Sequence, residues 1–429
     1  MLLFGAGTSE SRAEPAAISL QELIDTAHPG DELRLKSGQS YEGPAVIDRP
    51  VTIVGYGDVT IRNRSDQPAL TLQANGITLR GFRIADDQIN PKSSVVLIRS
   101  HHNRITDVEI VSQAGGIYLR EANDNVIENS RIIGANAEDK TEPYSRRGNG
   151  IDLHASADNL IQGNELIHVH DGVYVESSSN TRVIGNTAVD SRYGYHFMFS
   201  DMPEMIGNIG SNNVTGGMVM GVEGAIVRDN RFEKQTESVN SQGILLYDVH
   251  RSVIENNHVE GNRVGLYIEN SSNNDFVGND AINNFIGMQM IGSEGNSFKA
   301  GVFVANVVQA QATESSNNVL SGNYWDDFRG LDTDGDGTSD LPYEIDPLFL
   351  KITEQAEAYQ LFFQSPGLPF LTQLFRENTD SWLKDTRPLI DQPTSTGGPS
   401  SEGSTSAPYA LFLLLVSVTI IYQWGYKRK

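Results

Sequence analysis

Short runs of alternating apolar and polar residues, each opened by a glycine, recur along the middle of the chain. They begin at Gly116, Gly150, Gly172, Gly194, Gly217, Gly243, Gly265 and Gly287, at spacings of 34, 22, 22, 23, 26, 22 and 22 residues. Alternation of this kind is typical of β-strands, because successive side chains of a strand point to opposite faces. The pattern therefore predicts a repeating unit of about 22 residues that contains short strands.

Asparagines form a second column with the same period. They are Asn164, Asn186, Asn208, Asn230, Asn257, Asn279 and Asn323, spaced 22, 22, 22, 27, 22 and 44 residues apart. Asn suits the corners of a coil because it tolerates left-handed backbone and can hydrogen-bond along a column of identical neighbours. We predict an all-β fold, a right-handed parallel β-helix with helical caps and one C-terminal transmembrane helix. The sequence has neither the 3.6-residue periodicity of a helical solenoid nor the L-x-x-L-x-L pattern of leucine-rich repeats.

The β-helix is expected to span residues 18–346. Residues 18–27 have helical apolar spacing and predict an N-terminal cap, and residues 323–327 (NYWDD) resemble an aromatic plug at the other end. Residues 347–390 are largely apolar, leave the 22-residue register and predict a helical docking segment for a membrane partner. They could also pack on the end of the β-helix.

The two ends of the chain indicate export and anchoring. Residues 391–408 are rich in Pro, Gly, Ser and Thr and predict a flexible linker. Residues 409–426 carry no charge and predict a single transmembrane helix, with residues 427–429 as a basic cytoplasmic tail. Residues 1–17 are expected to be disordered or the remnant of an export signal. We therefore expect a single-pass protein of the cell membrane with its body on the extracytoplasmic side.

Composition excludes several classes of chemistry. The chain has no cysteine, which excludes disulfides, thiolate zinc sites, iron–sulfur clusters and a cysteine nucleophile. Its 32 basic and 55 acidic residues leave a net charge of −23, which disfavours nucleic acid and polyanionic substrates. Any metal handled outside the membrane must therefore be bound by His, Met or carboxylate groups.

Counting from each glycine predicts which side chains face outward. Residues one and three after a glycine are expected to point inward, so that Met218, Met220, Met288 and Met290 fill the core. Residues two and four after it are expected to point outward, as Asp152 and His154, Tyr174 and Glu176, and His196 and Met198 on three successive coils.

This register predicts a candidate copper site. The expected ligands are His154, His168, His170, His196, Met198 and Met202. Imidazole and thioether groups without cysteine suit copper in an oxidising compartment. The alternative is a solvated surface patch with no bound metal.

A second candidate metal site follows the repeats. Asp332, Asp334, Asp336 and Asp340 occupy positions 1, 3, 5 and 9 of a calcium-loop pattern, with glycine at position 6. Position 12 is Tyr343 instead of the bidentate glutamate of an EF-hand. The segment therefore predicts a site for calcium or a similar hard cation, or else an Asp/Gly turn.

Several segments resemble the NosD family over roughly residues 18–376. They are LQELIDTAHPGDELRL near the start, YGYHFMFSDMPEMIGN at residues 193–208, GSEGNSFKAGVFVANVVQAQ, GNYWDDFRGLDTDGDGTSDLPY and the tail LFFQSPGLPFL. Glycine-rich β-helix coils alone are unspecific, whereas the HFMFS segment together with the GNYW–DTDGDG closure is much more specific.

The resemblance implies an extracytoplasmic accessory protein for maturation of the copper sites of nitrous oxide reductase in denitrification, and no enzymatic activity. It implies as partners an ABC-type ATPase and permease, a copper chaperone and the reductase, with copper or sulfur as cargo. The C-terminal anchor departs from the family pattern and leaves the mode of docking open. One alternative is a β-helix polysaccharide lyase or hydrolase, for which Asp152 and Glu176 offer a carboxylate pair. Another is a surface scaffold without chemistry of its own.

Overall fold

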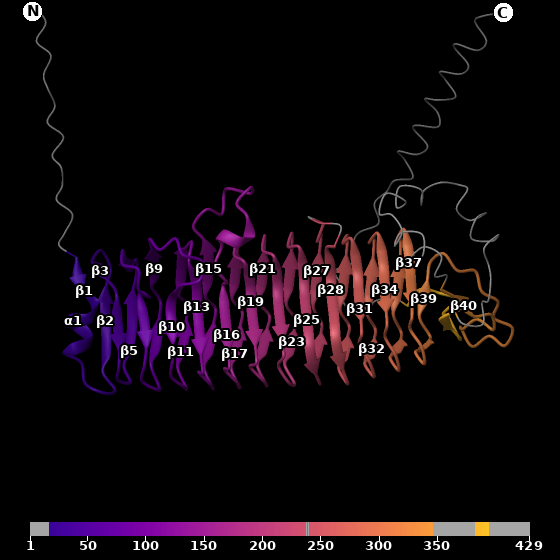
Figure 1. Ribbon diagram of the computed structural model, residues 1–429, viewed down its shortest axis with the longest axis horizontal. Coiled ribbons are helices and arrows are strands. Elements are labelled where there is room, and N and C mark those ends of the chain that lie inside the picture. The colour runs from indigo at the N-terminus through magenta and orange to yellow at the C-terminus, as the bar shows by residue number, and fades with distance from the viewer. Residues whose placement is uncertain (1–16, 237, 239, 346–381, 394–429) are drawn as a thin grey trace, which may run out of the picture. The chain divides into compact units, whose positions relative to one another are not determined.

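The chain forms a stack of coils built from three long parallel sheets (Figure 1). The computed structural model describes residues 17–236, 238, 240–345 and 382–393. Each regular coil contributes one strand to each of three sheets, which we call sheets A, B and C, and each strand pairs with its equivalents in the coils before and after it. There are about 14 coils of about 22 residues. The predicted all-β parallel β-helix is confirmed.

The strands are short, and most contain three to six residues. Sheet A contains β1 (Ile18–Ser19), β3 (Ser40–Glu42), β6 (Thr60–Asn63), β9 (Arg83–Asp86), β12 (Glu109–Ser112), β15 (Arg131–Gly134), β18 (Glu165–Ile167), β21 (Thr187–Val189), β24 (Ile209–Ser211), β27 (Arg231–Glu233), β30 (His258–Glu260), β33 (Asp280–Ile282), β36 (Val302–Val304) and β39 (Tyr324–Trp325). Sheet B contains β2 (Glu32–Lys36), β5 (Thr52–Tyr56), β8 (Thr78–Arg80), β11 (Arg104–Thr106), β14 (Val126–Glu128), β17 (Leu160–Gln162), β20 (Arg182–Ile184), β23 (Glu204–Ile206), β26 (Ile226–Arg228), β29 (Val253–Glu255), β32 (Asp275–Val277), β35 (Ser297–Lys299), β38 (Val319–Ser321), β41 (Lys384–Asp385) and β40 (Tyr343–Glu344). Sheet C contains β4 (Ala45–Ile47), β7 (Leu70–Leu72), β10 (Ser94–Ile98), β13 (Gly115–Arg120), β16 (Ile151–His154), β19 (Asp171–Glu176), β22 (Tyr193–Met198), β25 (Thr215–Glu223), β28 (Gln242–His250), β31 (Val264–Glu269), β34 (Ile286–Ile291) and β37 (Val308–Thr313).

A short helix covers the first coil. Helix α1 (Leu20–Asp25) begins after Ser19, whose hydroxyl accepts a hydrogen bond from the Glu22 amide at 3.4 Å. Leu20 and Ile24 are fully buried against the first coils. Covering the open end in this way prevents edge-to-edge association of the sheets.

The glycine column arises because successive coils approach too closely for a side chain. A Cβ on Gly172 would lie 2.4 Å from the carbonyl oxygen of Gly194, and a Cβ on Gly194 would lie 2.7 Å from that of Gly216. A Cβ on Gly216 would in turn lie 2.6 Å from the carbonyl oxygen of Gly243. The column therefore runs through Gly216 and not through Gly217, and its spacing at this coil is 22 residues.

Because of this one-residue difference, each side chain of β25 lies on the opposite face of sheet C from the one predicted. Met218 pairs with His196 in the parallel ladder, so that Met218 and Met220 lie on the outward face of sheet C. The prediction that these two methionines fill the core is wrong, because a shift of one residue moves every side chain of a strand to the other face. Met288 and Met290 are fully buried in the core, as predicted.

The asparagine column is a continuous ladder of buried hydrogen bonds. The Asn186 amide donates to Oδ1 of Asn208 at 2.9 Å, and Nδ2 of Asn208 donates to the Val183 carbonyl at 2.8 Å. Nδ2 of Asn208 also donates to Oδ1 of Asn230 at 3.1 Å. The preceding residue, Gly207, has a φ of +63°, which a glycine adopts without strain. The ladder therefore satisfies the buried main-chain groups of the corner.

Other corners carry ladders of the same kind. They include Asn103, Asn125 and Asn159, then Asn262, Asn284 and Asn306, then Asn274, Asn296 and Asn318. The gap of 44 residues in the first ladder is filled by Gly301, whose amide donates to Oδ1 of Asn323 at 2.9 Å.

A distant segment closes the C-terminal end of the stack. The Trp325 ring lies between those of Phe303 and Tyr343, at centroid distances of 4.2 and 4.4 Å. The buried carboxylate of Asp385 accepts hydrogen bonds from the Trp325 indole at 3.2 Å and from Nδ2 of Asn323 at 2.8 Å. Asp385 belongs to β41, which pairs with β38 and β40.

Some of the expected regions lie outside the described residues. Of the predicted docking segment, residues 382–390 are described and form β41 and the chain after it, whereas residues 347–381 lie outside. The predicted transmembrane helix at residues 409–426 and the linker after Pro393 also lie outside. Within the described ranges, no helix is long and apolar enough to cross a membrane.

Replacing Asn208 with alanine tests the ladder. The Asn208→Ala variant leaves the buried Asn186 amide without its partner and removes the side-chain bonds to the Val183 carbonyl and Asn230, and we expect it to lower the free energy of unfolding by about 3 kcal/mol. Asn240→Ala, at an exposed position, should change it by less than about 0.5 kcal/mol. Urea denaturation followed by circular dichroism measures both, and equal losses in the two variants would contradict the role given to the ladder.

Candidate functional site

The outward face of sheet C holds the candidate ligands in two adjacent columns. The first column runs Tyr118, Asp152, Tyr174, His196, Met218, and the second runs Arg120, His154, Glu176, Met198, Met220. Neighbours within a column are about 4.8 Å apart, and the columns are about 7 Å apart. The predicted outward register of His154, His196 and Met198 is therefore correct.

His196 is held in one orientation by a buried carboxylate. Its Nδ1 lies 2.8 Å from Oδ2 of Asp171, which is fully buried and also accepts hydrogen bonds from the Arg192 guanidinium at 2.8 and 2.6 Å. The rings of Tyr174 and Tyr193 pack edge-on against the imidazole, with centroids 4.9 and 4.8 Å away. His196 is thus a positioned side chain, only 5% exposed.

The other ring nitrogen of His196 has no partner. Nε2 is buried and makes no hydrogen bond to any described residue. In the neutral imidazole the proton on Nδ1 is donated to Asp171, so Nε2 carries a lone pair. Metal-binding histidines commonly donate the proton of one ring nitrogen to a carboxylate, which fixes the tautomer and the orientation of the ring. This nitrogen is therefore suited to bind a cation.

Three methionines surround His196 on the same face. Met198 is its neighbour along the strand, Met218 is its partner on the next coil, and Met220 lies diagonally opposite. The Tyr174 hydroxyl donates to the thioether sulfur of Met198 at 3.5 Å. Met218 and Met220 were not predicted as candidate ligands, because counting the register from Gly217 placed their side chains in the core. The Asn ladder, which keeps the 22-residue spacing here, could have corrected that register.

The remaining predicted copper ligands have surroundings of their own. His154 is half exposed, and its Nδ1 lies 3.1 Å from Oε2 of Glu176, two coils from Met198. Met202 is 59% exposed at the corner after β22. Nδ1 of His170 donates to the Tyr144 carbonyl at 2.8 Å, and burial lowers the pKa of this histidine.

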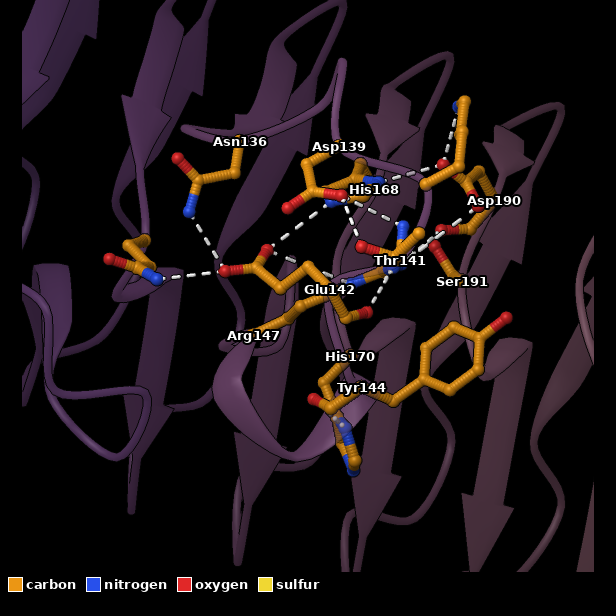
Figure 2. A network of polar contacts seen from close by, with 12 residues as sticks. Asn136, Asp139, Thr141, Glu142, Tyr144, Arg147, His168, His170, Asp190 and Ser191 are labelled. Atoms are coloured by element: carbon orange, nitrogen blue, oxygen red, sulfur yellow. Dashed lines mark hydrogen bonds and ion pairs between the residues drawn. The ribbon is translucent and has the colours of Figure 1, made fainter.

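His168 does not belong to the outward face. It is fully buried at the corner after β18, with Nδ1 2.7 Å from Asp190 and Nε2 3.3 Å from Glu142 (Figure 2). The expectation that it joins the other histidines on one patch is wrong, because the loop inserted before β16 covers it. Since each ring nitrogen already faces a carboxylate, His168 has no nitrogen left for a metal.

That inserted loop, residues 135–149, accounts for the 34-residue spacing between Gly116 and Gly150. It contains the 3-10 helix η1 (Tyr144–Arg146). Arg147 donates from Nη1 to the Asp190 carbonyl at 2.9 Å and from Nη2 to the Glu142 carbonyl at 2.7 Å (Figure 2). These bonds fasten the loop to the corner next to the outward face of sheet C.

The acidic loop brings together three of its four predicted ligands. Carboxylate oxygens of Asp332, Asp334 and Asp336 lie within 4.8 Å of one another. Asp340 is turned away, because its carboxylate accepts hydrogen bonds from the amide and hydroxyl of Thr333. Arg387, from the segment that closes the stack, forms an ion pair with Asp336.

A further group of possible ligands lies on sheet A. Glu233, His258 and Glu260 offer ligand atoms within 4.8 Å of one another. The 22-residue period does not predict this grouping, because the coil between β27 and β30 has 27 residues. Arg231 forms ion pairs with both glutamates. A hydrogen bond with Asp280 raises the pKa of His258. The arrangement is that of a surface ion-pair network.

The Asp171 interactions predict how stability depends on pH. Burial alone would raise the pKa of Asp171, but hydrogen bonds from His196 and Arg192 outweigh burial and lower it to about 2. Because the ordinary pKa is 3.8, this carboxylate stabilises the folded state fully above pH 4 and loses that effect as the pH falls through 2. The stability gap between wild type and Asp171→Asn should narrow by about 2 kcal/mol from pH 5 to pH 2. Urea denaturation at each pH measures the difference in stability between wild type and variant. Asp66→Asn, at an exposed site, is the control. A difference for Asp171→Asn that does not change with pH would refute the prediction.

Comparisons with known proteins agree with this architecture. Residues 133–330 match the family model described as periplasmic copper-binding protein (NosD), a stretch that includes His154, His196 and the outward methionines. Among solved structures, the pre-mature bacteriophage phi29 gene product 12 is similar with a TM-score of 0.52 and 12% identity, over 67% of this chain and 47% of that chain. That likeness concerns the fold alone.

Two curated relatives cover nearly the whole chain. A probable ABC transporter binding protein NosD from Pseudomonas aeruginosa is 27% identical over 93% of this chain and 96% of its own length. A protein of the same name from Stutzerimonas stutzeri is 25% identical over 92% of this chain and 94% of its own length. The family model and both relatives agree, and the chain is similar to NosD proteins over most of its length.

Proposed function

We propose that the protein is an extracytoplasmic accessory factor that binds copper and passes it on during maturation of the copper sites of nitrous oxide reductase. Copper is its cargo, and the protein is not an enzyme. The observation that carries the proposal is His196, whose buried Nε2 has no hydrogen-bond partner among the described residues and whose neighbours in the sheet register are Met198, Met218 and Met220.

The donor set suits a copper ion that must be released again. Thioether sulfurs are soft and uncharged, so they favour Cu(I), and a single imidazole adds a stronger ligand. The methionine side chains are flexible enough to converge on an ion near Nε2. Asp171 keeps the imidazole in the binding tautomer, and Tyr174 and Tyr193 exclude water from one side of the ring.

The comparisons support this cargo and the partners. The matching family model is described as periplasmic and copper-binding, and both curated relatives are named ABC transporter binding proteins. We therefore propose that the protein works with an ABC-type ATPase and permease, a copper chaperone and the reductase. Residues 347–381 are proposed to dock on the permease, and residues 409–426 to anchor the protein in the cell membrane.

The polysaccharide lyase or hydrolase is less well supported by the geometry. Asp152 accepts hydrogen bonds from Arg120 and Asn149, each at 2.7 Å, and Glu176 is engaged by His154. The two carboxylates also lie in different columns of sheet C. Neither is therefore available as an acid or a nucleophile in the arrangement seen here.

The acidic loop is proposed as a structural cation site. Asp332, Asp334 and Asp336 supply carboxylate oxygens, which calcium prefers. Because Arg387 already pairs with Asp336, a bound cation would share that carboxylate with the closing segment. Such a site would stabilise the C-terminal end of the stack and would take no part in copper transfer.

Copper titration of the full chain tests the ligand set. We expect His196→Ala and the double variant Met218→Leu/Met220→Leu each to weaken Cu(I) binding at least tenfold, because each removes ligands from the same ion. Anaerobic competition with a chromogenic Cu(I) chelator measures the affinity. Met288→Leu makes the same chemical change in the core and His258→Gln removes a histidine from sheet A, and neither should alter the affinity. Unchanged binding in the His196 and Met218/Met220 variants would refute this site.

Deletion of residues 350–376 tests docking. We expect the deletion to abolish co-purification with the permease while the circular dichroism spectrum of the β-helix is kept, because the described coils are built from other residues. The control is a deletion of residues 394–408 in the linker, which should leave co-purification intact. Retention of the permease by the first variant would rule out docking through this segment.

A further inference from the structure

A groove lies where the inserted loop meets the outward face of sheet C, and its nearest sheet residue in the His196 column, Asp152, is two coils before His196. Its volume is about 460 Å³. Tyr118 and Arg120 of β13 and Asp152 of β16 lie along its sheet side. Lys92, from the turn before β10, and Arg147, from the inserted loop, also line it.

Cations outnumber carboxylates in the lining of the groove, whereas carboxylates outnumber cations in the chain as a whole. The lining includes the cations Lys92, Arg120 and Arg147 but only one carboxylate, that of Asp152. That carboxylate is already bonded to Arg120 and Asn149. The net charge of −23 counts against anionic partners for the whole surface, but it does not describe this groove.

Arg120 presents an unused edge of its guanidinium. All of its hydrogen bonds, to the Leu119 and Asp152 carbonyls and to Oδ1 of Asp152, are made by Nη1. Nε and Nη2 make no hydrogen bond within the described part of the chain. The guanidinium lies over the Tyr118 ring with 4.6 Å to its centroid, which holds it in place. A free Nε–Nη2 edge in a fixed position matches the two oxygens of a carboxylate.

Of the two other cationic groups that line the groove, Lys92 has free donors and Arg147 does not. The Lys92 side chain is exposed and makes no hydrogen bond or ion pair with the described residues. Arg147 is only 3% exposed, and its guanidinium already faces the carboxylates of Glu142 and Asp190, each at 3.9 Å.

The size and the neutral groups of the groove narrow the ligand. A volume of about 460 Å³ falls in the range of small-molecule sites and far exceeds a single inorganic ion. His170 also lines the groove, and because its Nδ1 donates to the Tyr144 carbonyl, Nε2 is left as an acceptor for a hydroxyl group. We propose that the groove binds a small hydroxylated organic carboxylate, whose carboxylate sits on the Arg120 edge with Lys92 as a second cation.

Calorimetric titration of the full, copper-free chain with galacturonate tests this. We expect galacturonate to bind, glucose not to bind, and inorganic phosphate to bind at least tenfold more weakly than galacturonate. Arg120→Lys, which keeps the charge and the contact to Asp152 but removes the fork, should weaken galacturonate at least tenfold. Lys92→Gln should weaken it severalfold, whereas Lys299→Gln, the same change on β35, should have no effect.

Other outcomes would overturn the proposal. Phosphate binding as tight as galacturonate binding would show that charge alone is recognised and would refute an organic carboxylate. No binding of galacturonate by the wild type, or equal binding by Arg120→Lys, would refute the site itself. Because copper is absent and His196 is left intact, none of these results depends on whether the copper proposal holds.

Discussion

The contact between one coil and the next is the constraint on which the rest of the structure depends. Main-chain hydrogen bonds hold successive coils at the spacing of a parallel sheet, and at that spacing there is no room for a Cβ at the glycine column, as at Gly172 beneath Gly194. The same spacing lets the amide side chain of Asn186 or Asn208 reach the next coil and satisfy the buried main-chain groups of the corner. The repeat therefore reflects two requirements of one geometry: glycine where coils approach most closely, and asparagine where buried polar groups need a partner.

Because every coil repeats the register of the one before, functional side chains of successive coils are stacked in columns. A single residue on one strand is placed next to its equivalent on the following coil, so that His196 and Met218, 22 residues apart, become neighbours. An outward face built in this way can collect weak ligands without any local motif. It can also support them from below, since Asp171 of the preceding coil reaches the imidazole of His196. Copper binding, as proposed here, would use a surface whose geometry the solenoid already provides.

Departures from the regular coil carry the other specific features. The inserted loop of residues 135–149 is fastened by Glu142 and Arg147 to His168 and Asp190, and it forms one side of the cationic groove. At the C-terminal end, Asp385 returns from about 60 residues downstream to bond Trp325 and Asn323. Both features use buried charged or polar groups with partners, because such groups are stable in the interior only when they are paired.

The sequence by itself determined the fold class, the 22-residue period and the outward positions of His154, His196 and Met198, because these follow from local alternation repeated many times. It also located three of the carboxylates of the acidic loop, which are close in the chain. It misassigned Met218 and Met220, since two adjacent glycines left the register open by one residue and only the contact of Gly194 with Gly216 decides it. It placed His168 on the surface, since nothing local shows that an inserted loop folds over it. The free edge of Arg120, the unpartnered Nε2 of His196 and the capping role of Asp385 were decided only by the tertiary structure, because each depends on which distant groups are already bonded.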